Sequence, residues 1–138
     1  MIKVETPAIS MFPVKQLKPI EGFIPERVDY VLGELEKEKI WTTPLVVDNR
    51  YGLIMDGHHR HQAALYLGCH YVPAILWSYK EVEIYSLRED VNISLNGIIE
   101  NLENETIYPN KTVKHNFPFI LKSDLKISID DLKKYKRK

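Results

Sequence analysis

Cysteine is nearly absent from this sequence, neither sign of charge is in excess, and no long apolar run occurs. The 138 residues hold a single cysteine, Cys69, which excludes an intramolecular disulfide framework and favours a reducing compartment. Lys and Arg number 19 and Asp and Glu also number 19, so net charge gives no reason to expect a nucleic-acid partner. No segment reaches the roughly 20 apolar residues of a membrane span, and no signal peptide is apparent. These absences predict a cytoplasmic protein without a membrane partner.

Internal repeats and low-complexity segments are also missing, so we expect one ordinary globular domain over residues 1–138. Cys69 follows an apolar run and Gly68, and we interpret it as a buried structural thiol. Trp41 could contact a base or a substrate, but we expect it in the core. The basic end, DLKKYKRK, is interpreted as a solvated terminus, with a nucleic-acid arm as the alternative.

Proline and glycine divide the chain into short strands and helices. An edge strand containing Pro13 precedes a helix that starts at Pro25, and a hairpin surrounds the turn DNRYG. A helix from His58 to a stop at Gly68 leads into a central strand, YVPAILWSY, and SLNGIIENLEN predicts a helix capped by Ser94. EVEIYSL is either a strand or the start of a helix, and LKISIDDLKKY predicts a short strand followed by a helix. This mixture indicates the α/β or α+β class.

The stretch DGHHRHQAA, from Asp56 to Ala64, has the features of an anion-binding turn. A strand that ends in Asp-Gly and opens a helix directs unpaired backbone N–H groups and the positive helix end at one point, and Gly57 permits close approach. His59 and Arg60 would add donors, and Arg60 could bind a phosphate through two N–H groups. The Asp56 carboxylate could hold a hydrated Mg²⁺ against those phosphates.

Three structural alternatives compete with this interpretation. His58 and His61 stand three residues apart and can share a helix face, which raises a zinc site, although neither a cysteine nor a clear third ligand accompanies them. Asp56 could cap the helix, a role that is compatible with function. The histidines could also be exposed polar residues of the helix, and we expect this of His61.

A strand followed by DGHHRHQAALYLG resembles the signature of the ParB/sulfiredoxin superfamily. The superfamily's small α/β domain has a mixed sheet with helices packed around it and binds nucleotide at this turn. Two further stretches match in the same order. KPIEGF, residues 18–23, is similar to the segment that holds the family's catalytic glutamate, which falls at Glu21. YPNKTVKHNFPFI, residues 108–120, resembles the family's C-terminal Lys-Thr-x-Arg-His loop, with Lys114 in place of the arginine.

The residues that follow the glycine distinguish the branches of this superfamily. Sulfiredoxin has its catalytic cysteine where this chain has His58, so we do not expect sulfinic-acid reduction. ParB partition proteins carry Glu-Arg-Arg there and continue into a DNA-binding helical domain, for which 138 residues leave no room. The form Asp-Gly-His-His-Arg is similar to the free-serine kinase branch, whose members phosphorylate L-serine to O-phospho-L-serine.

The resemblance implies a set of roles for phosphoryl transfer from a nucleotide, ATP or ADP, to L-serine. From the residues alone, Glu21 is an exposed loop glutamate and the run NKTVKH is a solvated basic loop. The resemblance instead makes Glu21 and Asp56 catalytic, with Mg²⁺ near Asp56. It assigns nucleotide binding to Asp56, Gly57, His58, His59 and Arg60, and substrate binding to Lys111, Thr112 and His115.

Two rival functions stay open. The chain could be a ParB-like nucleotide-binding regulator that acts through DNA or a protein partner without kinase activity. A nuclease would require carboxylates beyond Asp56, and none stands beside it in the sequence. The segment between EVEIYSL and SLNGIIENL is shorter than in typical family members, which leaves open a relaxed specificity or a lost activity.

Overall fold

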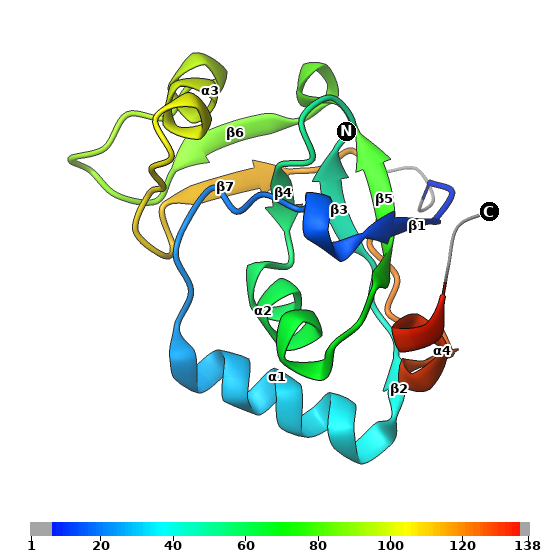
Figure 1. Ribbon diagram of the computed structural model, residues 1–138. Helices are drawn as coiled ribbons and strands as arrows, with labels where there is room; N and C mark the ends of the chain where they lie inside the picture. Colours follow the sequence, from blue (N-terminus) through cyan, green and yellow to red (C-terminus); the bar gives the residue numbers. More distant parts are fainter. Residues whose placement is uncertain (1–6, 136–138) are drawn as a thin grey trace.

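The structure, a computed structural model, describes residues 7–135 and is built on a central four-stranded sheet (Figure 1). The strand order is β1-β5-β3-β4. β5 pairs antiparallel with β1 and parallel with β3, whereas β3 and β4 form an antiparallel hairpin. The sheet is therefore mixed, and the predicted α/β class is confirmed. The bounds are β1 Ser10–Pro13, β3 Leu45–Asp48, β4 Ile54–Asp56 and β5 Tyr71–Trp77.

Local sequence explains most of this sheet. β1 lies at an edge, as Pro13 predicts, because proline has no N–H to donate to a second neighbour. β5 is central, and all four residues of β3 are buried beside it. The predicted hairpin turn DNRYG is present: the Asp48 carboxylate accepts the Tyr51 N–H at 2.7 Å, and Gly52 has a φ of +77°.

Two helices cover the side of the sheet on which the polar turn lies. α1 spans Pro25–Glu38 with Pro25 in its first turn, and α2 spans His58–Leu67 and ends at Gly68, whose φ is +76°. α2 packs against the sheet, and α1 lies along the side of α2 that faces away from the sheet (Figure 1). His61 is consequently only 5% exposed, so the expectation that it is an exposed helix residue was wrong. The burial follows from the tertiary packing around α2, which the spacing within α2 does not reveal.

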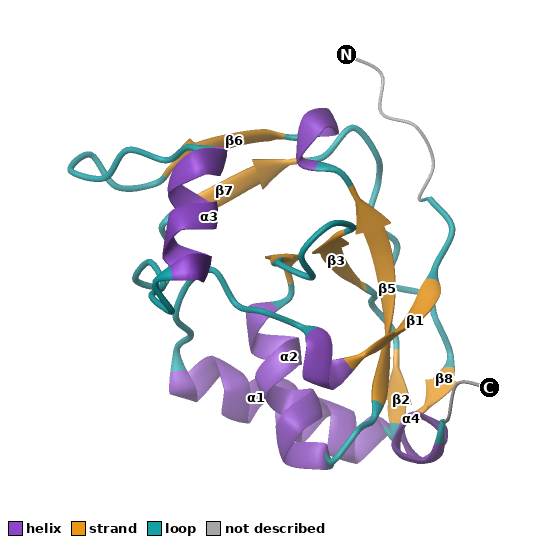
Figure 2. Ribbon diagram, turned by 45° about the horizontal axis from the view of Figure 1, so that its top comes forward, coloured by secondary structure: helices purple, strands orange, loops and turns teal. Residues whose placement is uncertain are grey.

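Two small sheets complete the fold. β6, which resolves EVEIYSL as a strand, pairs antiparallel with β7, and α3 lies beside this pair (Figure 2). The Ser94 hydroxyl caps α3 by accepting the Gly97 N–H, as predicted. β2 pairs with β8 next to α4. The bounds are β2 Ile40–Trp41, β6 Glu83–Ser86, α3 Leu95–Glu103, β7 Val113–Asn116, β8 Ile127–Ser128 and α4 Ile129–Lys134, with short 3₁₀ turns at Val14–Gln16 and Tyr79–Glu81.

The core confirms two expectations about single residues. Trp41 is fully buried in the main cluster between the sheet and the helices, and Cys69 is a buried free thiol in the same cluster. The last three residues of the basic end lie outside the described residues, as do residues 1–6. Within residues 7–135, no helix is long and apolar enough to cross a membrane.

Candidate functional site

A cavity of about 760 Å³ opens where the N-terminal end of α2 meets α1, β7 and the segment that follows β7. Its polar wall combines residues from three distant parts of the chain: Glu21, the turn Asp56–Arg60, and His115. Apolar side chains that include Trp41 and Phe119 form much of the remaining wall. The fold therefore brings together the three sequence segments that motif matching had singled out one by one.

The turn at the start of α2 requires glycine. Gly57 has a φ of +112°, and a Cβ at this position would lie 2.7 Å from Cγ of the fully buried Leu45. No side chain caps α2, and the first intrahelical bond runs from the His61 N–H to the Gly57 carbonyl at 2.8 Å. The preceding N–H groups of the helix therefore have no helical acceptor, and the helix dipole adds positive potential at the cavity wall. This arrangement suits a phosphate group.

His58 and His59 bind the loop that carries Glu21. Nε2 of His58 accepts the Ile20 N–H and Nε2 of His59 accepts the Ile24 N–H, each at 3.1 Å. Burial, and then the neighbouring histidines, lowers the pKa of His58 to about 3, and burial also lowers the pKa of His59. Both rings are therefore neutral at pH 7, and because Nε2 accepts, the proton is on Nδ1.

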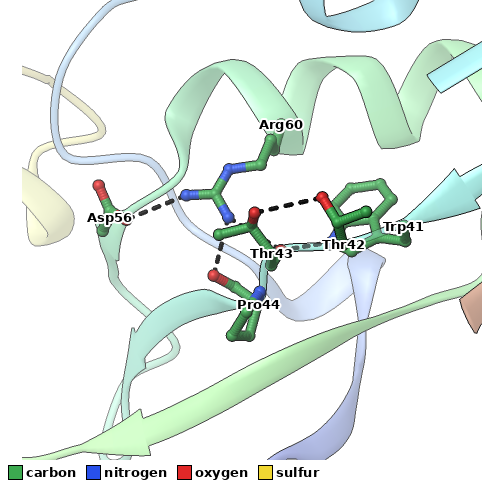
Figure 3. Close-up of polar contacts among 6 residues, drawn as sticks. All are labelled: Trp41, Thr42, Thr43, Pro44, Asp56 and Arg60. Carbon is green, nitrogen blue, oxygen red and sulfur yellow. Dashed lines mark hydrogen bonds and ion pairs between the residues drawn. The ribbon is translucent and has the colours of Figure 1, made fainter. Parts of the chain in front are cut away.

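Arg60 turns back from α2 to the connection between β2 and β3 (Figure 3). Nη1 donates to the carbonyl oxygens of Thr43 and Pro44 at 2.9 and 2.8 Å, and Nη2 donates to Oδ2 of Asp56 at 3.0 Å. The guanidinium thus supports the turn from within, although it also lines the cavity. Asp56 accepts from Arg60 and does not cap α2, so the capping alternative is not what the structure shows.

Glu21 lines the same cavity as this turn and is anchored through one oxygen. Its Oε2 accepts the backbone N–H groups of Thr112 and Val113 at 3.1 and 3.0 Å. The flanking backbone pairs with Tyr108, through Gly22 N–H to Tyr108 O and Tyr108 N–H to Ile20 O, each at 2.9 Å. Glu21 is partly buried, which differs from the exposed loop glutamate that the residues alone suggest.

His115 on β7 faces the same cavity. The residue is 8% exposed, its Nε2 is 3.0 Å from Oη of Tyr79, and its ring stacks on Phe117 with an interplanar angle of 6°. Burial lowers the pKa of His115 to about 4, while the Asp56 carboxylate acts in the opposite direction. The imidazole is therefore neutral at pH 7, and it lies close enough to the Asp56 carboxylate for the two groups to interact electrostatically.

The other two predicted substrate residues are placed differently. Thr112 is fully buried and does not line the cavity: its hydroxyl donates to the Pro109 carbonyl at 2.6 Å and accepts from Arg88 at 2.9 Å. Lys111 is exposed, has a φ of +53°, and its charge contributes to lowering the pKa of His59. Lys111 thus lies near the turn at the start of α2. The hydroxyl of Thr112 is engaged by hydrogen bonds to Pro109 and Arg88.

Arg27 and Tyr79 escaped sequence reasoning. Arg27, in the first turn of α1, lines the cavity and supplies positive charge, and Tyr79 holds His115. Lys114 on β7, which the sequence marked only as the replacement for the family's arginine, also lines the cavity. Arg27 stands only a few residues after the Glu21 segment, and this proximity in the sequence could have indicated that it lies near the site. Nothing local marks Tyr79, because its contact with His115 depends on the pairing of β6 with β7.

The donor atoms at the cavity suit an ion that also binds phosphate oxygens. Among residues 7–135, no group of three or more His, Cys, Asp and Glu side chains is placed to hold a metal by itself. The Asp56 side chain is 43% exposed and lines the cavity, and Arg60 fixes only its Oδ2. Mg²⁺ is commonly held by one or two carboxylates together with substrate phosphates and water, so a single carboxylate here fits that ion.

Sequence comparison finds two relevant relatives, whereas no family model matches the chain. A ParB-like protein of Sulfolobus acidocaldarius is 37% identical over 70 residues, which cover 51% of this chain and 35% of that protein. An ATP-dependent L-serine kinase of Staphylothermus marinus is 29% identical over 103 residues, covering 70% of this chain and 41% of that protein. The chain thus matches well under half the length of either relative.

Solved structures show the same fold over nearly the whole chain. A free serine kinase in complex with AMP superimposes with a TM-score of 0.83 at 13% identity, covering 95% of this chain and 96% of that one. A glutamate-to-alanine mutant of a free serine kinase, in complex with ADP, gives a TM-score of 0.82 at 12% identity with the same coverage. Together with the two sequence relatives, these structures confirm the resemblance to ParB-like proteins and to free serine kinases that the sequence motifs indicated.

Proposed function

We propose that this chain, which has the fold of the ParB/sulfiredoxin-like free serine kinases, transfers a phosphoryl group from a nucleotide to free L-serine. The product would be O-phospho-L-serine, with ATP or ADP as the donor. The observation that carries this proposal is the common cavity of Glu21, Asp56 and the N-terminus of α2. Phosphoryl transfer requires mainly positioning and charge neutralisation, and these three elements supply both.

The phosphates of the nucleotide would bind at the start of α2. The N–H groups after Gly57 are without helical acceptors there, and Lys111 and Arg27 contribute positive charge around His59. His58 and His59 are neutral rings that hold the Glu21 loop against the turn, so they shape the phosphate site more than they charge it. Asp56 would hold Mg²⁺, a group that supplies charge neutralisation for the transferred phosphoryl when bound.

Glu21 would accept the proton of the serine hydroxyl. As the serine oxygen forms its bond to the terminal phosphorus, the bond from phosphorus to the bridging oxygen breaks and the shortened nucleotide leaves. Since Oε2 of Glu21 is occupied by two backbone N–H groups, Oε1 is the oxygen that would take the proton. A carboxylate fixed in this way needs little rearrangement to reach a bound hydroxyl.

The substrate's amino acid moiety would lie near His115 and Lys114 on β7. Both line the cavity, and Lys114 could pair with the carboxylate of serine while His115 lends a neutral ring beside it. Thr112 would contribute through its backbone N–H to Glu21, since its hydroxyl is occupied within the loop. Phe117 and Phe119 would help exclude water, which limits hydrolysis of the nucleotide.

The test is direct formation of product. The protein is incubated with Mg²⁺, L-serine and either ATP or ADP, and O-phosphoserine is measured in each arm. We expect product in at least one arm and a loss of turnover on the order of 100-fold or more in Glu21→Gln, the usual range for removing a general base. Glu26→Gln is the matched control, because Glu26 is an exposed acid of α1 outside the cavity.

Absence of product with both nucleotides would refute the kinase proposal. If nucleotide still binds, the alternative is a ParB-like nucleotide-binding regulator, which the 37% identity to a ParB-like protein favours. Product formation by Glu21→Gln at the unsubstituted rate would instead leave the activity in place and remove Glu21 as the base.

A further inference from the structure

Arg88 lies outside the cavity, in the short segment between β6 and α3, and reaches the loop that anchors Glu21. Its Nε donates to the Thr112 hydroxyl at 2.9 Å and its Nη2 donates to the Asn110 carbonyl at 2.7 Å. Both ends of the turn before β7 are thus held by one planar guanidinium, a geometry that lysine cannot reproduce.

The backbone of Arg88 is itself fixed, so the side chain projects from a defined point. The Ser86 hydroxyl donates to the Arg88 carbonyl at 2.7 Å and accepts the Arg88 N–H at 3.0 Å. The Leu87 N–H donates to the Thr112 carbonyl at 2.8 Å, which extends the pairing of β6 with β7 up to the turn. The guanidinium therefore projects from a backbone position that hydrogen bonds hold in place.

The turn that Arg88 holds is one that needs support. Lys111 has a φ of +53°, a left-handed conformation that is costly for a residue with a side chain. Directly after it, the N–H groups of Thr112 and Val113 converge on Oε2 of Glu21. Any relaxation of Lys111 would rotate the Thr112 N–H away from that oxygen.

We propose that Arg88 is a positioning residue for Glu21, acting through Thr112. The proposal rests on the proposed function for its kinetic consequence, but its structural content stands on the contacts alone. Arg88 and the Thr112 hydroxyl keep the turn in the shape that aims two N–H groups at Oε2, which leaves Oε1 directed to the substrate. Thr112, predicted as a substrate contact, thereby becomes the link between the segment 87–93 and the carboxylate.

Two substitutions test the link. Arg88→Met removes both donors while retaining a long side chain, and Thr112→Val removes only the hydroxyl and keeps the backbone N–H that Glu21 accepts. Arg50→Met is the matched control, since Arg50 is exposed in the β3–β4 turn, where its guanidinium lies over the Tyr51 ring.

The first measurement is the NMR amide shifts of Thr112 and Val113 in the ligand-free protein. Glu21→Gln identifies how these shifts respond when the acceptor changes. We expect Arg88→Met and Thr112→Val to move the same two amides, and Arg50→Met to leave them in place. Unchanged shifts in both variants would overturn the proposal, whether or not the protein is a kinase.

The second measurement is turnover. We expect Arg88→Met to lower kcat about tenfold with the KM for nucleotide unchanged, the loss that a misplaced base would cause. In the Glu21→Gln background, Arg88→Met should have no further effect, because both substitutions disable the same carboxylate. Additive losses would overturn positioning through Glu21. Absence of turnover in the unsubstituted protein would refute the kinase proposal. The amide shifts alone would then test the positioning role of Arg88.

Discussion

Replacing Gly57 with alanine tests the turn on which the phosphate site depends. A residue with a Cβ at a φ of +112° is strained by at least the roughly 1–2 kcal/mol of a left-handed residue. The added Cβ would also lie 2.7 Å from Cγ of Leu45, a fully buried residue of β3, so one of the two groups would have to shift. Overpacking of this kind costs about 1–3 kcal/mol. The free energy of unfolding should therefore fall by about 2–5 kcal/mol in Gly57→Ala.

Two other glycines separate the conformational cost from the steric cost. Gly68, at the end of α2, has a φ of +76°, but a Cβ added there would meet nothing within 4 Å, so Gly68→Ala should lose only about 1–2 kcal/mol. Gly33 lies inside α1 with open space and an ordinary helical backbone, so Gly33→Ala should gain about 0.5–1 kcal/mol. The three substitutions should rank in that order.

Urea unfolding monitored by tryptophan fluorescence measures all three differences, since Trp41 is in the main core cluster. Equal losses for Gly57→Ala and Gly68→Ala would show that Leu45 yields to the new methyl group, and a neutral Gly57→Ala would refute the turn geometry itself. Nucleotide binding by the folded fraction adds a functional readout. We expect weaker binding in Gly57→Ala and unchanged binding in Gly68→Ala, because only the first alters the N–H groups at the start of α2.

Two further predictions concern the polar groups around this turn. Arg60→Met should lower the free energy of unfolding by about 1.5–3 kcal/mol in urea titrations, because it leaves the Thr43 and Pro44 carbonyls without their charged donor; an unchanged midpoint would contradict the supporting role. His115 has a folded pKa of about 4, below the ordinary 6.5, so the unfolded chain binds the proton first. His115 alone should therefore contribute a loss of about 2 kcal/mol of stability as the pH falls from 8 to 5, beside a similar contribution from His58, and His115→Asn should remove the His115 part; identical pH profiles would refute the assignment.

Local sequence signals predicted the elements well because each had a physical marker. Pro13 placed β1 at an edge, Pro25 opened α1, and Gly68 closed α2 in a left-handed conformation. The Ser94 cap and the DNRYG hairpin followed from side-chain oxygens that accept nearby backbone N–H groups. Such interactions join residues a few positions apart, so the sequence displays both partners together.

The parts of the site that sequence reasoning missed depend on contacts between distant segments. Arg60 stays a predicted phosphate ligand at the cavity, but the sequence did not reveal that it also donates to the carbonyls at positions 43 and 44, which fold against α2 only when the sheet forms. The hydroxyl of Thr112 was expected at the substrate, yet Arg88 holds it from a segment between β6 and α3. The burial of His61 depends on the tertiary packing of α2 and not on its local spacing. Pattern and spacing supply the residue types, and only the packing decides what each one faces.

The two proposed catalytic carboxylates are anchored in the same way. Each gives one oxygen to the protein: Oδ2 of Asp56 to Arg60, and Oε2 of Glu21 to the N–H groups of Thr112 and Val113. Their separation is fixed as well, because the rings of His58 and His59 accept the N–H groups of Ile20 and Ile24, on either side of Glu21. His58, which the sequence also offered as a zinc ligand, and His59 thus join the acid of the turn to the acid of the loop. We therefore expect that replacing either ring with alanine would impair turnover more than nucleotide binding, since the phosphates contact the backbone of α2.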